Sequence, residues 1–198
     1  MGKHIIIEGV MGVGKTTLLC EIRKKINIAC VIQDYKHNIC LTDFYAGKDC
    51  AFQKQMIFLF SNYHLLVDAE TRFPAFISDF CLERSIIMSD AMLSGSDLTL
   101  YKDNYRYLKQ KLSYEKMLIL LHGEVNTIMN HIEWRGRTSE RNISPDYITR
   151  CQNALIDNIG SIRAKEIVDI NIDTIDTVSQ ECVDFLIAKI SDFLRSTC

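Results

Sequence analysis

Short apolar runs alternate with longer amphipathic segments along the whole chain. Five runs have the length and apolar content of buried strands, and they cover residues 4–7, 27–33, 75–82, 116–121 and 166–170. The spacing of apolar positions predicts helices at 16–26, 50–70, 99–113, 124–134 and 175–195, with a further helix start at Ser144-Pro145-Asp146. Strands that alternate with helices form a parallel sheet covered on both faces. The pattern therefore predicts an α/β fold with its ligand site at the carboxyl ends of the strands.

No stretch of the 198 residues resembles a linker, because the chain has only two prolines, no low-complexity segment and no internal repeat. We expect a single domain over residues 1–198, with a short lid at about 135–143. In the last predicted helix, seven apolar residues are expected on one stripe: Ile175, Val178, Cys182, Phe185, Leu186, Ile190 and Phe193.

Composition narrows the range of partners. The chain is 47% hydrophobic and 24% charged, with a net charge of −2, so it lacks the basic surplus of proteins that bind a nucleic-acid polymer. No apolar run approaches the roughly 20 residues that span a bilayer, and we expect no membrane partner. The eight cysteines are scattered without metal-ligand spacing, and a predicted strand begins almost at once, which favours reduced thiols, no targeting segment and a cytoplasmic location.

Residues 8–17, EGVMGVGKTT, contain the pattern G-x-x-x-x-G-K-[ST] between a predicted strand and a predicted helix. Glycines let the backbone N–H groups face phosphates, and the helix N-terminus favours negative charge. Lys15 is expected to reach the β- and γ-phosphates of a nucleoside triphosphate, and the Thr16 hydroxyl to bind Mg²⁺. The loop residues expected to bind the nucleotide are Gly9, Gly12, Val13, Gly14, Lys15, Thr16 and Thr17.

Two further segments carry charge suited to phosphoryl transfer. FCLERS is predicted to place Glu83 and Arg84 at the end of a strand, where the acid can hold a magnesium shell or a substrate hydroxyl and the arginine can neutralise the charge of the phosphoryl group. A surface ion pair is the alternative. WRGRTSER places Arg135, Arg137 and Glu140 between two helices, as either a solvated loop or a lid that closes over phosphates.

The order of these segments resembles the deoxyribonucleoside kinase family, which includes deoxycytidine, deoxyguanosine and thymidine kinases. The matching segments are IIIEGVMGVGKTT, AFQKQ on a long helix, ERS, LTLYKDNYRYL, RGRTSERNISPDYI and VDINID, over nearly the whole chain. The resemblance implies a P-loop kinase fold with a five-stranded parallel sheet and an arginine-rich lid. It also implies a Mg²⁺-dependent enzyme that transfers the γ-phosphate of ATP to the 5′-hydroxyl of a deoxyribonucleoside, and a homodimer formed through helices such as 50–70 and 99–113.

The resemblance also implies roles for residues near the phosphates. Glu83 resembles the carboxylate of the family that belongs to the metal shell and also lies near the substrate. Arg84 resembles the arginine that stabilises the transition state. Arg135 and Arg137 resemble the lid arginines. His131 stands where the family often has a basic side chain stacked on adenine.

Other positions match the substrate contacts and the adenine site. Glu140 and Tyr45 resemble the pair that holds the sugar 3′-hydroxyl, and Gln55 the glutamine that binds the base edge. Asp173 and Thr174 fall where a loop contacts the adenine edge.

The chain departs from the family pattern after its second predicted strand, as expected for a compact, divergent member. The usual Glu-Pro pair, whose Glu takes the proton from the 5′-hydroxyl, is replaced within VIQDYKHN. Asp34 is the nearest carboxylate and can act as a general base, although Gln33 could occupy the same place and Asp34 could be a turn residue.

The base pocket departs from the pattern too. Asn62 and Ser89 stand where members that favour deoxycytidine and purines have an arginine and an aspartate, although Asp90 could still reach the pocket. A pocket without that charged pair is expected to favour a pyrimidine.

Two other functions compete with the nucleoside kinase. A nucleoside monophosphate kinase of the thymidylate kinase type shares the loop, the sheet and the lid, but it needs an arginine after the second strand, where this chain offers an acid. A protein that binds a nucleotide without turnover would not need Lys15, Glu83, Arg84 and the lid arginines together.

Overall fold

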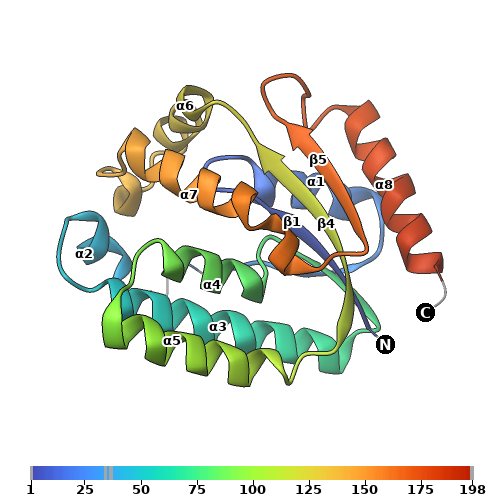
Figure 1. Ribbon diagram of the computed structural model, residues 1–198. Helices are drawn as coiled ribbons and strands as arrows, with labels where there is room; N and C mark the ends of the chain where they lie inside the picture. Colours follow the sequence, from blue (N-terminus) through green and yellow to red (C-terminus); the bar gives the residue numbers. More distant parts are fainter. Residues whose placement is uncertain (1, 34, 36–37, 197–198) are drawn as a thin grey trace.

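The protein forms a single five-stranded sheet in which every pair of neighbouring strands is parallel. The computed structural model describes residues 2–33, 35 and 38–196, apart from the side chain of 139. The strand order is β2-β3-β1-β4-β5 (Figure 1). The strands are β1 (Gly2–Glu8), β2 (Ala29–Val31), β3 (Ala75–Ser78), β4 (Tyr114–His122) and β5 (Glu166–Asn171). The predicted α/β class and the five-stranded parallel sheet are confirmed.

Helices cover both faces of the sheet, as Figure 1 shows. They are α1 (Lys15–Lys25), α2 (Leu41–Tyr45), α3 (Ala51–Arg72), α4 (Leu82–Asp90), α5 (Gly95–Lys109), α6 (Val125–Arg135), α7 (Pro145–Asp157) and α8 (Gln180–Arg195), with the 3₁₀ turns η2 (Thr138–Glu140) and η3 (Ile159–Ile162). Helices α1 and α8 pack together, α3, α4 and α5 form a second layer, and α6 contacts α7. Within the described ranges, the helices are too short or too polar to cross a membrane.

Strand β1 is buried on both faces, as expected for the centre of a parallel sheet. Ile5 and Ile7 join the core beneath α1 and α8, whereas Ile6 packs with Leu118 and Ile162 on the opposite face. The central position of β1 brings its carboxyl end, and the loop after it, next to the ends of β3 and β4.

Several predicted boundaries were wrong, including those of β3 and α8. Strand β3 ends at Ser78, and ERS lies in the first turn of α4, because Cys81 caps this helix by accepting a hydrogen bond from the Arg84 N–H at 3.4 Å. Helix α8 begins at Gln180 because the Ser179 hydroxyl caps it.

The predicted apolar stripe of the last helix is only partly buried. Ile175 and Val178 precede the helix and are exposed, and Phe185 is also exposed. The buried members of the stripe are Cys182, Leu186, Ile190 and Phe193.

His4 is fully buried in β1 and is held in one tautomer. The Ser78 hydroxyl donates to the Phe80 carbonyl, so it accepts from His4 Nε2 at 2.6 Å. Nδ1 is buried without a hydrogen-bond partner among the described atoms. Burial, and then the positive charge of Lys116, lower the pKa of His4 well below the ordinary value of 6.5.

We expect His4 to make the fold sensitive to mild acid. Below about pH 6.5 the unfolded chain binds a proton at His4 that the folded protein does not, so stability falls by up to about 1.4 kcal/mol per pH unit. Urea unfolding between pH 5 and 8 measures this slope, and His4→Leu should reduce it. His64→Gln, on an exposed position of α3, is the control; equal slopes in the parent and His4→Leu would contradict the assignment.

Candidate active site

The loop between β1 and α1 has the backbone of a phosphate-binding loop. Gly9 has φ 151°, and a Cβ there would lie 2.4 Å from the Leu121 carbonyl oxygen of β4. Gly12 has φ 83°, and a Cβ there would lie 2.7 Å from a side-chain carbon of Ile132 in α6. Both positions therefore require glycine, one for close approach to the sheet and the other for packing of the loop against α6.

Lys15 is the first residue of α1 and points back into the loop. Its Nζ donates to the carbonyl oxygens of Gly9 and Val10 at 2.8 and 2.9 Å. Burial, followed by the positive charge of Arg84, lowers the pKa of Lys15 to about 7. A phosphate bound beside Lys15 would favour the charged form of this side chain.

Arg84 is fastened to the base of the loop by a buried ion pair. Its Nη1 donates to Glu8 Oε1 at 2.5 Å and to the Gly9 carbonyl at 2.6 Å. Glu8 is fully buried, and its Oε1 also accepts from the Gly9 N–H at 2.9 Å. These contacts hold the guanidinium beside the phosphate loop and raise the pKa of Arg84 further, although burial opposes that rise.

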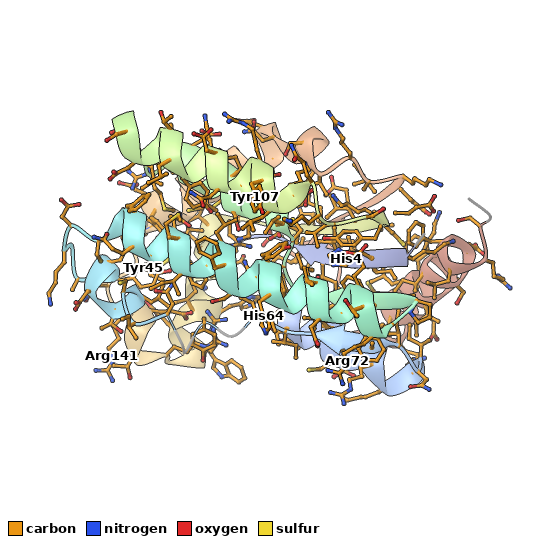
Figure 2. The ribbon with its side chains drawn as sticks, turned by 90° about the horizontal axis from the view of Figure 1, so that it is seen from below. His4, Tyr45, His64, Arg72, Tyr107 and Arg141 are labelled. Carbon is orange, nitrogen blue, oxygen red and sulfur yellow. The ribbon has the colours of Figure 1, made fainter. Side chains whose placement is uncertain are left out.

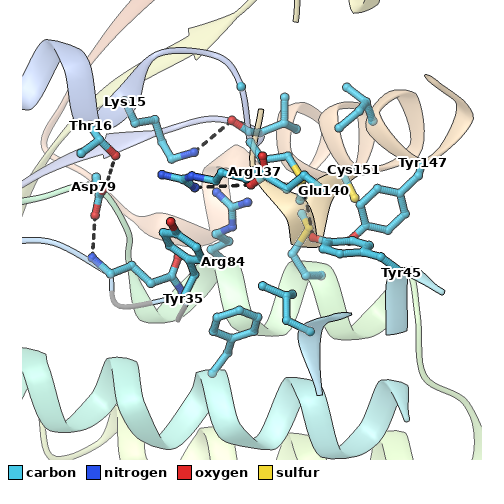
Figure 3. A pocket seen from close by; sticks show the side chains of 18 of the residues that line it. Lys15, Thr16, Tyr35, Tyr45, Asp79, Arg84, Arg137, Glu140, Tyr147 and Cys151 are labelled. Atoms are coloured by element: carbon cyan, nitrogen blue, oxygen red, sulfur yellow. Dashed lines mark hydrogen bonds and ion pairs between the residues drawn. The ribbon is translucent and has the colours of Figure 1, made fainter. Parts of the chain in front are cut away.

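A carboxylate lies next to the loop threonine. Asp79, directly after β3, accepts a 2.6 Å hydrogen bond from the Thr16 hydroxyl and a 2.8 Å bond from the Gln33 N–H (Figure 3). A loop threonine paired with a strand-end aspartate is the donor set with which P-loop enzymes hold Mg²⁺. Within the described ranges, no group of three His, Cys, Asp or Glu residues could hold a metal alone, so phosphate oxygens and water would have to complete such a site.

The predicted lid residues converge on one carboxylate. Glu140 is buried and accepts hydrogen bonds from Arg135 at 2.5 Å and Arg137 at 3.3 Å. The Arg137 guanidinium also lies over the Tyr35 ring, 4.0 Å from its centroid. The segment after α6 thus reaches across to the loop that follows β2 (Figure 3).

Lys15, Asp79, Arg84 and the predicted lid residues line one pocket of about 380 Å³. Its phosphate-loop end is cationic, with Lys15, Arg84, Arg135 and Arg137, and its other wall belongs to α3. The predicted site residues that line it are Gly12, Gly14, Lys15, Thr16, Thr17, Tyr45, Gln55, Asn62, Arg84, Arg135, Arg137 and Glu140. Gly9 and Val13 shape the loop from behind, where Val13 is part of the core.

The nucleoside-side residues are held by specific partners. Asn62 Oδ1 accepts a 3.1 Å hydrogen bond from Gln33 Nε2, and Gln55 Nε2 donates to the Met92 sulfur at 3.0 Å. The Tyr45 ring packs edge-on against Tyr147 of α7 with centroids 5.9 Å apart, and burial raises the pKa of Tyr45. This end of the pocket is therefore a mixture of aromatic, thioether and amide groups, which suits a nucleoside.

Glu83 is not placed as its predicted metal role requires. The side chain is buried outside the pocket lining, and Oε1 is paired with Lys116 and Lys109. The helical start at Leu82 turns Glu83 away from the loop while Arg84 faces it. The predicted general base Asp34 lies outside the described residues, whereas Gln33 lines the pocket.

The three residues predicted for adenine lie outside the pocket lining, around the P-loop and the carboxyl ends of β4 and β5. His131 of α6 places Nδ1 3.0 Å from the Gly12 carbonyl. Asp173 accepts from the Glu124 N–H at 2.6 Å, and a hydrogen bond from Thr127 contributes most to lowering the pKa of Asp173. The Thr174 hydroxyl donates to the Asn171 carbonyl.

Sequence reasoning missed three polar residues of the site. Glu8 and Asp79 both follow apolar strand residues at the carboxyl edge, and that position was an available signal for a site residue. Lys54, in the first turn of α3, had no such signal, because a lysine in an amphipathic helix is usually exposed.

A phosphate loop, a strand-end carboxylate and several arginines on a parallel α/β sheet define a P-loop phosphotransferase. Residues 5–195 match the family model described as deoxynucleoside kinase. The chain belongs to the deoxynucleoside kinase family.

Individual relatives agree with this assignment. The chain is 30% identical to deoxyguanosine kinase of Bacillus subtilis (strain 168) over 196 residues, which cover 96% of this chain and 92% of that protein. It is 25% identical to deoxyadenosine/deoxycytidine kinase of the same organism over 190 residues, which cover 89% and 86%. These matches confirm the predicted ATP-dependent deoxynucleoside kinase and do not favour the thymidylate kinase alternative.

The fold also matches a solved structure described as deoxyadenosine kinase from M. mycoides with bound dATP. The TM-score is 0.81 with 20% identity, over 95% of this chain and 98% of that one. At this identity the likeness establishes the fold.

Proposed function

We propose that the protein transfers the γ-phosphoryl group of ATP to the 5′-hydroxyl of a deoxyribonucleoside. The observation that carries this proposal is one pocket with a cationic phosphate loop at one end and an aromatic and amide wall at the other. The loop N–H groups and Lys15 hold the phosphates. Arg84, oriented by Glu8, lies where charge accumulates on the transferred group.

Thr16 and Asp79 are the residues that would hold magnesium. When bound, the ion supplies positive charge that offsets the charge of the phosphate oxygens. The Thr16 hydroxyl and Asp79 are already hydrogen-bonded and line the pocket, so the chain presents this donor set without rearranging its backbone.

We propose that Asp34 takes the proton from the acceptor 5′-hydroxyl, with Gln33 as the alternative at this position. Support comes from the chain on either side, because Gln33 and Tyr35 both line the pocket. A carboxylate can accept this proton, whereas a glutamine can only orient the hydroxyl.

We also propose that residues 135–143 form a lid on the single domain 1–198. Arg135 and Arg137 are held by Glu140 and can turn to the phosphates, while Glu140 and Tyr45 hold the sugar 3′-hydroxyl. His131, Asp173 and Thr174 are proposed for the adenine of ATP, supported by the contact of His131 with the phosphate loop.

The lid residues should differ in their kinetic effects. Arg137→Ala should lower kcat by about tenfold or more, because the arginine acts on phosphoryl charge. Glu140→Ala should raise KM for nucleosides that carry a 3′-hydroxyl and matter less for 3′-deoxy analogues. Steady-state kinetics on both substrate types separates the roles, and equal effects of Glu140→Ala on both would remove Glu140 from the sugar site.

The expected preference for a pyrimidine is not supported. The named relatives act on deoxyguanosine and on deoxyadenosine or deoxycytidine, which weighs slightly against it. We therefore extend the proposed acceptors to purine deoxynucleosides.

A homodimer through α3 and α5 and a cytoplasmic location remain predictions. The face formed by these two helices (Figure 2) exposes Phe60, Leu100 and Tyr107. Seven cysteines of the described chain are free, which suits a reducing compartment.

The proposal is tested with labelled ATP and a panel of the four natural deoxynucleosides and their monophosphates. The expected result is labelled 5′-monophosphate with at least one nucleoside. Transfer only to monophosphates would replace the proposal with the monophosphate kinase, and absence of transfer to any acceptor would refute both.

A further inference from the structure

Lys54 is a buried cation in the pocket wall that the proposed mechanism does not use. The residue is 2% exposed and lines the pocket from α3. Its Nζ lies 3.2 Å from the centroid of the Phe44 ring and 3.4 Å from the Met92 sulfur. Within the described part of the chain, no carboxylate forms an ion pair with it.

These partners satisfy an ammonium poorly. An aromatic face attracts the charge but has no lone pair to accept a hydrogen bond, and a thioether sulfur is a weak acceptor. Burial, with the positive charge of Arg84 adding to the effect, lowers the pKa of Lys54 to about 7. A strong hydrogen-bond acceptor on a ligand would therefore stabilise the charged form of Lys54.

Gln55, the residue after Lys54, contacts the same methionine. Gln55 is 4% exposed, and its Nε2 donates to the same Met92 sulfur at 3.0 Å. Two donors from consecutive residues of α3 thus converge on one sulfur. Met92 lines the pocket in the connection between α4 and α5, and a flexible methionine can move aside for a ligand.

The ligand group that reaches this wall is the base. The phosphates belong at the opposite end, with Lys15 and Arg84, and Phe58 and Met88 supply apolar surface beside Gln55. A guanine presents O6 and N7 as acceptors, and a thymine or uracil presents O4, whereas adenine and cytosine present an amino donor at the corresponding position. An ammonium has donors only.

We propose that Lys54, together with Gln55, selects deoxynucleosides whose base carries a carbonyl at purine C6 or pyrimidine C4 over those that carry an amino group there. The inference rests on the proposed function, and it concerns a residue to which no role is assigned there. This selection is independent of the choice between purine and pyrimidine, because each class contains one natural base with a carbonyl and one with an amino group at this position.

The test compares deoxyinosine with deoxyadenosine, which differ only at C6 and N1. The parent protein should prefer deoxyinosine in kcat/KM, and Lys54→Met should reduce that preference by about 10- to 100-fold, the value of a hydrogen bond to a charged group. Deoxyuridine and deoxycytidine form the matching pyrimidine pair. Methionine keeps the length of the stem and removes a buried charge, so thermal unfolding of this variant should not occur at a lower temperature.

Lys48→Met is the matched control, because Lys48 is exposed and paired with Asp43 outside the pocket. It should leave the substrate ratio unchanged. An unchanged ratio in Lys54→Met, or a parallel loss for both substrates, would show a packing role and overturn the inference.

Calorimetric binding of the two nucleosides separates this inference from the proposed function. If none of the four natural deoxynucleosides is phosphorylated, the proposed function fails, but the binding preference between deoxyinosine and deoxyadenosine is still measured. A preference for deoxyinosine that Lys54→Met removes supports the role of Lys54, and equal affinities in the parent protein refute it.

Discussion

Lys15→Ala is expected to lower phosphoryl transfer by roughly 10²–10³-fold or more while the protein remains folded. Lys15 Nζ lies in the loop where the phosphates are expected, and it donates to the carbonyl oxygens of Gly9 and Val10. Burial, followed by the positive charge of Arg84, lowers the pKa of Lys15 to about 7, and the phosphates of ATP would favour its charged form. Alanine also favours helix and places no new group in the core.

The measurement is kcat and kcat/KM with saturating nucleoside, together with thermal unfolding. Lys25→Ala is the control, since Lys25 lies at the other end of α1 and pairs with Asp184 on the surface. Turnover of Lys15→Ala near the parental rate would remove the loop from the catalytic site.

Asp79→Asn and Glu83→Gln are expected to have opposite kinds of effect. Asp79 bonds the Thr16 hydroxyl, so its neutralisation should lower kcat by roughly 10²-fold and raise the magnesium concentration required. Glu83 is buried against Lys116 and Lys109, so Glu83→Gln should leave the magnesium requirement unchanged. It should instead lower the free energy of unfolding by roughly 1–3 kcal/mol.

Magnesium titrations of activity and urea unfolding of both variants distinguish the two roles. A raised magnesium requirement in Glu83→Gln, with Asp79→Asn unaffected, would restore the role that the sequence alone suggested for Glu83. That result would also mean that α4 begins differently when substrates are bound.

The sequence by itself determined the features that depend on neighbouring residues. The phosphate-binding residues span 9–17, with the glycines in the loop after β1 and the lysine and threonines in the first turn of α1. The contacts among the predicted lid residues are also local, because Arg135 and Arg137 both donate to Glu140 within six residues. The alternation of apolar strands and amphipathic helices was likewise sufficient for the α/β class.

Only the tertiary structure decided which of two nearby acids faces the loop. Asp79 and Glu83 are four residues apart, and the end of β3 and the start of α4 between them set their directions. The sequence pattern predicted a strand through residue 82 and therefore assigned the metal role to Glu83. A helix cap formed by the Cys81 sulfur, a weak acceptor, gives no clear signal in a sequence.

Contacts between distant residues were also decided by the fold. Glu8 and Arg84 are separated by 76 residues and meet because β3 lies beside β1 in the sheet. The helical pattern predicts an exposed position for Lys54. The packing of α2 and of the connection after α4 instead buries it against Phe44 and Met92. Periodicity shows which face of a helix is apolar, whereas the loss of water around one charge depends on which other elements cover it.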